Sequence, residues 1–291
     1  ETLQSLERRI GSADELLSVT RTMRGLAAVS LRHYELAADA LASYEAVIED
    51  GLHIALRDGA IDRLPVGSSP AEAPAAVIVF GSNQGLCGPI NRHVAAHARA
   101  ETSGIASVVH FAAVGARMVA ELDVVGITPG IRWDLPGTVE AIPTRAEQIL
   151  AQAERWQIED GVGSLFLVFP HFLGRNRGSE PVMLQLLPTD RDWLEWLAVR
   201  RWPSRVLPTF TMPWEGLLAD LIRQALFVRL HRGFAQTMAA VASSRLAALT
   251  AAQNSIEERI VELRQRHHQV RHAEITKELL DVISGFETIQ D

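Results

Sequence analysis

A glycine-rich segment that follows an apolar run is the first place in this sequence where chemistry could occur. The run Ala76–Phe80 is followed by Gly81, Gly85 and Gly88. Closely spaced glycines after a strand can expose backbone N–H groups that bind phosphate at the start of a helix. The segment lacks both the glycine fingerprint for dinucleotides and a lysine followed by Ser or Thr. We therefore interpret residues 81–88 as a tight structural turn, with a phosphate cradle as the alternative.

The single cysteine, Cys87, lies in this turn. A catalytic thiol needs a paired base, and His93 and His97 are near in sequence. A small packing residue is the interpretation that we favour, because a reactive thiol needs a specific electropositive surrounding. One cysteine also excludes an internal disulfide and fits a reducing compartment.

Two histidines near the C-terminal end, His268 and His272, are four residues apart and would share one face of a helix, as metal ligands often do. Arg266 and Arg271 would repel a cation at that face. We expect a polar helix surface or a subunit contact there instead of a metal site.

Three tryptophans, Trp193, Trp196 and Trp202, could mark a pocket, but a core patch or the rim of a domain is the favoured interpretation. None of these sets joins a nucleophile, a base and an orienting group. The sequence therefore predicts no catalytic, cofactor-binding or metal-binding residue.

Composition narrows the class of partner. The net charge of -7 and the pI near 5.8 argue against nucleic-acid binding, which needs a concentrated basic face. No apolar run approaches the roughly 18 to 20 residues that span a bilayer, and the N-terminus lacks the apolar core of a signal peptide. We expect no direct membrane insertion and association with a membrane only through partners.

Prolines divide the chain into three parts. All of them lie between Pro65 and Pro213, which leaves two long proline-free ends. Because proline breaks a helix interior, the ends can form helices of unusual length. We predict an N-terminal coiled-coil helix over 1–60, an α/β domain over 75–200 and a C-terminal coiled-coil helix over 214–290, with linkers at 61–74 and 202–213.

Apolar residues recur at alternating three- and four-residue steps in both ends, which is typical of a coiled coil. The two helices would most simply pair antiparallel with each other. A one-residue shift interrupts the C-terminal pattern after Val270. The predicted N-terminal seam is Leu3, Leu6, Ile10, Ala13, Leu17, Thr20, Met23, Ala27, Leu31, Tyr34, Ala38 and Leu41, and the C-terminal seam is Ile256, Ile260, Leu263, His267 and Val270, resuming at Ile275, Leu279, Val282 and Phe286.

Strand and helix patterns alternate in the middle, which favours a small α/β domain with a mostly parallel sheet. Expected strands are 76–80, 108–114, 165–169 and 182–187, and expected helices are 91–100, 116–122 and 143–158. The predicted fold class is thus α/β plus a long antiparallel coiled coil, with the α/β domain inserted between the paired helices.

Three motifs in this order resemble the gamma subunit family of rotary F-type ATP synthases. Residues 79–91 are similar to the family's strand followed by Ser-Asp-Arg-Gly-Leu-Cys-Gly-Gly and a nearby Asn. Residues 271–279 resemble its Arg-Gln-Ala-x-Ile-Thr-x-Glu-Leu, and residues 20–28 its Thr-Lys-Ala-Met-x-Met-Val-Ala-Ala. Asn83, Gln84 and Pro89 stand in place of the family's Asp, Arg and second Gly of the loop. These departures suggest a divergent branch, such as an alternative ion-translocating ATPase.

The resemblance implies a central rotor subunit without an active site of its own. It would couple rotation of a membrane ring, driven by proton or sodium ion flow, to ATP synthesis or hydrolysis in a hexamer of alpha and beta subunits. Implied partners are the alpha and beta subunits, the epsilon subunit and the membrane c-ring. The implied location is the cytoplasmic side of a bacterial inner membrane, as a peripheral part of the complex.

The resemblance also implies which residues meet the hexamer. Polar and charged side chains would form a catch against loops of a catalytic subunit, namely Arg271, His272, Thr276 and Glu278. Arg24, next to Met23, would belong to the same contact region. Apolar side chains at the end of the helix would turn in a greasy sleeve: Ile275, Leu279, Val282, Ile283 and Phe286. Two alternatives stay open at this point, a coiled-coil scaffold unrelated to rotary motors and an α/β enzyme with helical arms.

Overall fold

The structure is a computed structural model. It describes residues 2–57, 73–105, 107–175, 177–202, 205–206 and 208–290, and it describes the side chains of these residues except those of 38, 39, 42 and 281–290. Most of the expected linker at 61–74 lies outside the described residues. The chain divides into two compact units, Glu1–Ala28 with Arg245–Asp291, and Val29–Ser244.

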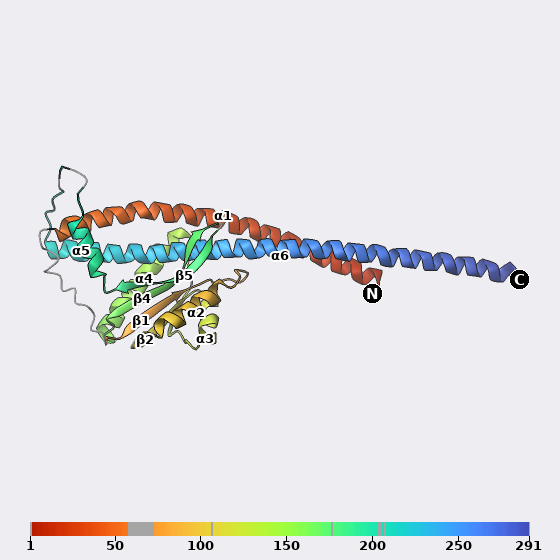
Figure 1. Ribbon diagram of the computed structural model, residues 1–291, viewed down its shortest axis with the longest axis horizontal. Helices are drawn as coiled ribbons and strands as arrows, with labels where there is room; N and C mark the ends of the chain where they lie inside the picture. The colour runs from red at the N-terminus through yellow and green to blue at the C-terminus, as the bar shows by residue number, and fades with distance from the viewer. Residues whose placement is uncertain are drawn as a thin grey trace. The chain divides into compact units, whose positions relative to one another are not determined.

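Two long helices enter both units: α1 (Leu3–Leu56) near the N-terminus and α6 (Trp214–Gln290) at the C-terminus (Figure 1). Neither contains proline, so their backbone hydrogen-bond ladders run uninterrupted. Mean helix length in globular proteins is about three turns, and most of the stability of such helices comes from packing of an apolar face. Both predicted terminal helices are confirmed.

In the first unit the two helices pair antiparallel. Ion pairs join Arg21 to Glu257 at 2.7 Å, Asp14 to Arg264 at 3.3 Å and Glu7 to His267 at 3.4 Å, so residue numbers fall on one helix as they rise on the other. The apolar residues of the predicted seams lie between the helices. Those buried are Leu6, Leu17, Ala27, Ile260 and Leu263.

One position of the predicted N-terminal seam is wrong. Met23 is 41% exposed, and the neighbouring Arg24 takes the half-buried position that the seam requires. Steps of four and three residues from Thr20 through Arg24 to Ala27 replace the expected steps of three and four. Arg24 can fill this position because its aliphatic stem packs while its guanidinium stays near the Glu257 carboxylate.

The second unit carries a five-stranded sheet in the order β3-β2-β1-β4-β5. Its strands are β1 (Ala75–Phe80), β2 (Val108–Val114), β3 (Ile131–Trp133), β4 (Ser164–Gly174) and β5 (Gly178–Leu187). All neighbouring pairs are parallel except β4 with β5, which form an antiparallel hairpin. The prediction of a mostly parallel sheet is confirmed, whereas β3 was not predicted.

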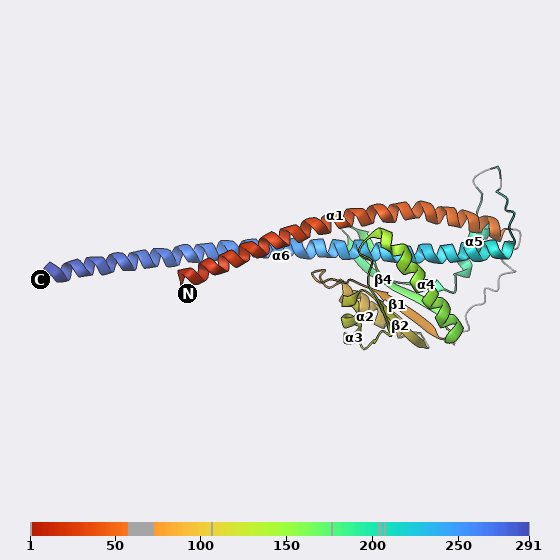
Figure 2. The same ribbon diagram turned by 180° about the vertical axis from the view of Figure 1, so that it is seen from behind.

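Helices cover both faces of this sheet (Figures 1 and 2). On one face, Val77 and Val79 of β1 pack against α2 (Ile90–Thr102) and α3 (Ala116–Val124). On the other face, Ile78 and Phe80 pack against α4 (Ile142–Glu159) and α6. A central parallel strand is buried on both faces, which is why residues 75–80 are apolar without alternation.

The unit has a further apolar cluster where α1, α6 and the short helix α5 (Arg191–Val199) meet. Leu52 of α1, Leu197 of α5 and Val228 of α6 are buried there. The indole nitrogen of Trp214 donates to the Ala55 carbonyl at 2.6 Å, and the Tyr44 hydroxyl donates to Gln224 at 3.0 Å. The α1–α6 pairing is therefore antiparallel in this unit as well.

Candidate functional site

The glycine turn after β1 uses its polar groups internally. The Ser82 N–H donates to Asn91 Oδ1 at 3.0 Å, and the Ser82 carbonyl accepts from Arg117 N–H at 2.9 Å. A Cβ added at Gly81 would lie 2.6 Å from Met118 Cε and 2.7 Å from Asn91 Oδ1, so this position has no room for a side chain. These contacts agree with the interpretation of the segment as a structural turn.

Asn83 joins this turn to two other loops. Its Oδ1 accepts from Leu135 N–H at 2.9 Å and from Ala116 N–H at 3.3 Å, and its Nδ2 donates to the Leu135 carbonyl at 2.7 Å. Asparagine offers both an acceptor and a donor, and both are needed to bind the N–H and the carbonyl of the same residue, Leu135. The side chain thus ties the ends of β1, β2 and β3 together.

The place where an open α/β sheet would bind a ligand is occupied by α6. The chain leaves β1 toward β2 and β3 and returns to β4 on the other side, so the switch in strand order lies between β1 and β4. There Phe234 of α6 packs edge-on against Phe80 at a centroid distance of 5.0 Å. Gln236 accepts from Phe172 N–H at 2.9 Å, and Ser244 donates to the Cys87 carbonyl at 2.6 Å.

Cys87 belongs to this contact with α6. It is buried with Ile90, Ala240 and Val241, and its sulfur lies 3.3 Å from the Ser82 hydroxyl. His93 is exposed, and His97 lies 4.0 Å from Glu101. The thiol therefore packs in the interior, as the favoured interpretation expected.

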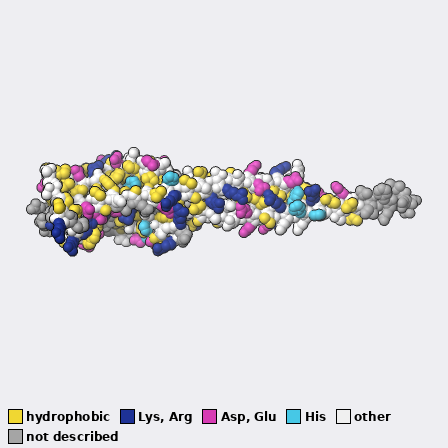
Figure 3. Space-filling view, turned by 90° about the horizontal axis from the view of Figure 1, so that it is seen from above, with side chains coloured by type: hydrophobic (Ala, Val, Ile, Leu, Met, Phe, Trp, Pro, Cys, Tyr) yellow, Lys and Arg dark blue, Asp and Glu magenta, His cyan; other side chains and the backbone are white. Residues whose placement is uncertain are grey.

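The histidine pair with the spacing of metal ligands lies on an exposed surface. His268 and His272 are both exposed on α6, and within the described ranges no group of three or more His, Cys, Asp or Glu side chains could hold a metal ion. Figure 3 shows histidine side chains (cyan) gathered with arginines and acidic residues near the described end of the helix. This surface is polar and charged.

The three tryptophans are separate. Trp193 stacks under Arg229 at 4.3 Å, Trp196 lies 5.9 Å from the Arg200 guanidinium, and Trp202 stacks on His53 at 5.6 Å. Trp193 and Trp196 belong to α5 and Trp202 follows it, and each of the three contacts a different side chain.

The expected catch residues fall into two groups that the structure does not bring together. Arg24 lies level with Glu257, whose carboxylate also accepts from Arg21 at 2.7 Å and from Gln253 at 3.0 Å. Arg271 follows Glu257 by fourteen positions, which is about 21 Å along a helix at 1.5 Å per residue. The hydrogen bond from Arg21 is the largest cause that lowers the pKa of Glu257.

The second group projects from the last described turns of α6. Every residue from 271 to 280 is exposed, including Arg271, His272 and Glu278. The Thr276 hydroxyl donates to the His272 carbonyl at 2.8 Å, so its proton is used within the helix.

The apolar bearing residues extend this exposed surface. Ile275 and Leu279 are 44% and 58% exposed, so the expected resumption of a seam within the chain is wrong at these two positions. The side chains of Val282, Ile283 and Phe286 lie outside those that the structure describes.

Sequence reasoning missed a second apolar stripe on α1. Leu16, Val19, Met23 and Leu26 are all more than 40% exposed and follow each other at steps of three, four and three. The three- and four-residue spacing of this stripe is visible in the sequence. It runs beside the seam stripe on the same helix, and spacing alone does not say which of the two stripes is buried. Large exposed apolar stripes mark surfaces that contact other molecules.

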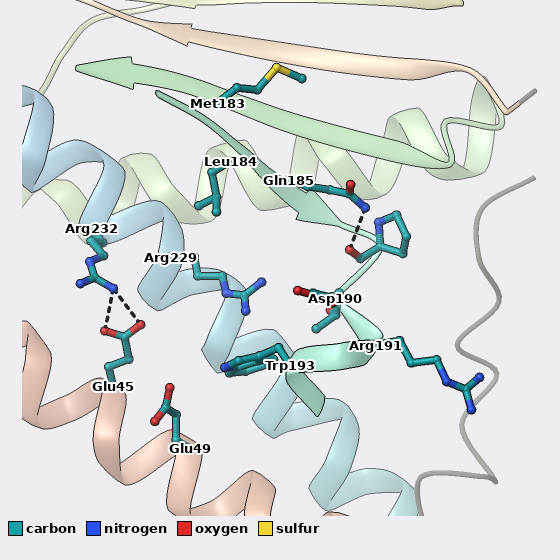
Figure 4. Close-up of a pocket in the computed structure, with 12 residues that line it drawn as sticks. Glu45, Glu49, Met183, Leu184, Gln185, Asp190, Arg191, Trp193, Arg229 and Arg232 are labelled. Carbon is teal, nitrogen blue, oxygen red and sulfur yellow. Dashed lines mark hydrogen bonds and ion pairs between the residues drawn. The ribbon is translucent and has the colours of Figure 1, made fainter. Parts of the chain in front are cut away.

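Sequence reasoning also missed a hollow of about 1080 Å³ beside β5 (Figure 4). Its lining comes from α1, β5, the loop before α5, α5 itself and α6, so no local motif could reveal it. The charged side chains that face it include Glu45, Glu49, Asp190 and Arg229.

Among the helices that the structure describes, none has an apolar stretch of the length and hydropathy that a membrane span requires.

Comparison with known proteins agrees with this geometry. A family model described as ATP synthase matches residues 2–289. The ATP synthase gamma chain of Anaeromyxobacter sp. (strain Fw109-5) is 25% identical over 308 residues, which cover 99% of each chain. That of Salinibacter ruber is also 25% identical and covers 99% of this chain and 98% of its own.

Solved structures share the fold. A chain in the mitochondrial ATP synthase of Euglena gracilis (OSCP/F1/c-ring, rotational state 3) has a TM-score of 0.67 at 12% identity and covers 99% of this chain and 94% of that one. A chain of the rotor of the same enzyme in rotational state 1 has a TM-score of 0.61 at 11% identity and covers 94% and 99%. With the family model matched over residues 2–289, the chain belongs to the ATP synthase gamma chain family.

Proposed function

We propose that this chain is the central stalk of a rotary ATP synthase, the shaft that couples rotation of a membrane ring to ATP synthesis or hydrolysis in a hexamer of alpha and beta subunits. The observation that carries the proposal is family membership over residues 2–289, joined to two proline-free helices that pair antiparallel in each unit. The matches favour this function over a coiled-coil scaffold unrelated to rotary motors.

The surface of the paired helices suits a shaft because it is asymmetric. In the first unit, the apolar stripe of Leu16, Val19 and Leu26 on α1 and charged side chains such as Arg264 and Glu262 on α6 are both exposed. A surrounding subunit would meet a different chemistry at each angle of the shaft. Differential contact of this kind favours one conformation of each catalytic subunit over another, which is allosteric coupling.

ATP chemistry belongs, in this proposal, to the partner subunits. In the turn after β1, the Ser82 N–H donates to Asn91 and the Ser82 carbonyl accepts from Arg117. Phe234 of α6 packs at the switch in strand order. Both observations support a sheet that serves as a mount for the helices instead of a nucleotide site. The chain would then be a non-catalytic subunit.

The exposed end of α6 is proposed to form the catch and the bearing. Arg271, His272 and Glu278 present charge to a catalytic subunit, and Ile275 and Leu279 provide the non-directional apolar contact that lets a shaft turn. Exposed ion pairs contribute only about 0 to 1 kcal/mol each, so several of them must act together or be desolvated. Val282 and Phe286 extend the bearing in this proposal, and Met23 with Arg24 forms a separate contact further along the shaft.

The proposed partners are the alpha and beta subunits, the epsilon subunit and the c-ring. The similar chains of known structure come from assemblies whose titles name F1, a c-ring and a rotor. The similar gamma chains belong to bacteria such as Anaeromyxobacter. We therefore place the chain on the cytoplasmic side of a bacterial inner membrane, as a peripheral part of the complex.

Co-purification tests the proposal. The tagged chain is expressed with candidate alpha and beta subunits of the same organism, and the purified material is assayed for ATP hydrolysis and subunit composition. We expect a stable ATP-hydrolysing complex that contains one copy of this chain. A chain that elutes alone, with the alpha and beta subunits present but unbound, would contradict the proposal.

A further inference from the structure

The hollow beside β5 contains a cation that has no hydrogen-bond or ion-pair partner among the described residues. Arg229 of α6 lies with its guanidinium 4.3 Å over the ring of Trp193, and it donates no hydrogen bond and makes no ion pair within the described part of the chain. Figure 4 shows it reaching into the hollow between Trp193 and Asp190. Its planar N–H donors therefore remain unused.

The other charges around the hollow are already engaged. Arg232 pairs with Glu45 at 3.2 Å, Glu49 lies 3.7 Å from Arg200, and Asp190 accepts from Asp192 N–H at 3.0 Å at the start of α5. Burial is the largest cause that lowers the pKa of Arg229, and Asp190, Glu45 and Glu49 act against it from a distance. The Arg229 nitrogens are not among the buried polar atoms that lack a partner, so the guanidinium opens onto the hollow, where a carboxylate from outside can reach it.

The same hollow follows the free edge of the sheet. β5 is the last strand in the order β3-β2-β1-β4-β5, and three of its consecutive residues, Met183, Leu184 and Gln185, line the hollow. Side chains of consecutive strand residues point to opposite faces of the sheet. Because all three residues line the hollow, the hollow lies along the outer edge of the strand. An outer edge offers backbone N–H and C=O groups to an extended segment.

We propose that this hollow binds an extended segment of a neighbouring subunit, whose aspartate or glutamate side chain pairs with Arg229 while its main chain lies along β5. The guanidinium fork matches a carboxylate in bidentate geometry. The carboxylates of Glu45, Glu49 and Asp190 around the hollow would oppose the higher charge of a phosphate group. The inference rests on the proposed function in one respect, because the neighbour is a subunit of the assembled complex.

Site-directed photo-crosslinking in the assembled complex tests the proposal. The exposed Gln185 is replaced by p-benzoyl-phenylalanine, the complex is irradiated, and the cross-linked peptide is identified by mass spectrometry. We expect one peptide from another subunit with an Asp or Glu next to the cross-linked residue. The exposed Val109 of β2, on a different strand, serves as the control position for the same probe.

Charge exchange then tests the role of Arg229. Arg229→Glu should lower the cross-link yield at position 185 by about tenfold or more, and changing the identified acid to Arg in the same complex should restore it. Arg229→Lys keeps the charge and loses the fork, so we expect an intermediate yield. Arg223→Glu is the matched control, because Arg223 lies on the same helix, is exposed and pairs with Glu154 away from the hollow.

Two results would overturn the inference. One is a complex that assembles and hydrolyses ATP but gives no cross-link from position 185. The other is a cross-link whose yield Arg229→Glu leaves unchanged. In both cases the assembled complex shows that the proposed function stands while this inference fails.

Discussion

The side chain of Asn83 holds three loops together, so a substitution at this residue tests the contacts assigned to it. Its amide presents an acceptor to Leu135 N–H and Ala116 N–H, and a donor to the Leu135 carbonyl 2.7 Å away. The resembling family carries an aspartate in this position of the loop. In this chain an aspartate would place a second carboxylate oxygen against that carbonyl.

We predict that Asn83→Asp destabilises the chain although it restores the family residue. Losing one donor and opposing two oxygens should cost about 1 to 3 kcal/mol. The unfolding midpoint of the full chain in urea measures this. Gln84→Glu makes the same change of charge at the exposed neighbour and should have little effect. Equal stability of Asn83→Asp and the unchanged chain would contradict the assigned contacts.

The Glu35–Arg175 pair gives a prediction about pH. Arg175 donates to both Glu35 oxygens, at 3.0 and 2.7 Å, and this hydrogen bonding is the largest cause that lowers the pKa of Glu35 below 4.5. A lowered carboxyl pKa contributes stability that is present above the unfolded pKa and is lost as the pH falls through the folded pKa.

We therefore expect Arg175→Met to lower the melting temperature at neutral pH, and we expect this effect to shrink as the pH falls below the unfolded carboxyl pKa and through the lower pKa of Glu35 in the folded chain. Melting temperatures of both proteins over a pH series provide the measurement. Arg177→Met removes the same charge from an exposed residue of the same hairpin, and its effect should not follow this pH dependence. A difference that persists unchanged at low pH would show that packing of Arg175, and not its charge, is responsible.

At the scale of elements, α6 serves two purposes. It is one of the paired helices in both units, and within residues 29–244 it also covers a face of the sheet through Leu230, Phe234 and Met238. Gly233 allows the approach: a Cβ there would lie 3.8 Å from Phe169 and 4.0 Å from Leu167 and Phe80. These are ordinary contact distances, unlike the 2.6 Å at Gly81.

We therefore predict opposite effects on stability when each of the two glycines is replaced by alanine. Gly233→Ala should stabilise the chain by about 0.5 to 1 kcal/mol, because alanine favours the helix and fits the space. Gly81→Ala should destabilise it by about 1 to 3 kcal/mol, because Met118 and Asn91 must move. Denaturant unfolding of both variants measures the pair. A loss of stability at Gly233→Ala would mean that α6 packs closer to the sheet than the structure has it.

The long helices and most of the sheet could be predicted because their signals are local. Proline-free ends, an apolar run at 75–80 and Pro143 at the start of α4 each act within a few residues. β3 has three residues, Ile131–Trp133, which is too short for alternation to appear. The choice of Arg24 over Met23 in the seam depends on Glu257, and the hollow at Arg229 depends on several elements, so neither could be read locally.

At the scale of the whole molecule, the proposed role as a shaft depends on side chains that are exposed in the chain alone. Residues 271–280 of α6 are all exposed, and the stripe of Leu16, Val19, Met23 and Leu26 on α1 has no cover in the described structure. Exposed apolar and charged surface of this extent fits a protein that works inside an assembly.

We predict that Arg271→Ala weakens coupling in the assembled complex without abolishing nucleotide binding. Loss of one charged contact should lower ATP-driven torque and coupled ATP synthesis several-fold if neighbouring charges act with it. Arg259→Ala is the matched control, because Arg259 lies on the same helix and pairs with Glu262 within it. Unchanged torque and synthesis in Arg271→Ala would remove this residue from the catch.

Single-molecule rotation tests the central claim most directly. The alpha and beta subunits are fixed to a surface, a probe is attached to this chain within the assembled complex, and ATP is added. The account predicts stepwise rotation of the probe in one direction that depends on ATP hydrolysis. A complex that hydrolyses ATP while the probe stays still relative to the alpha and beta subunits would contradict the role of this chain as the shaft.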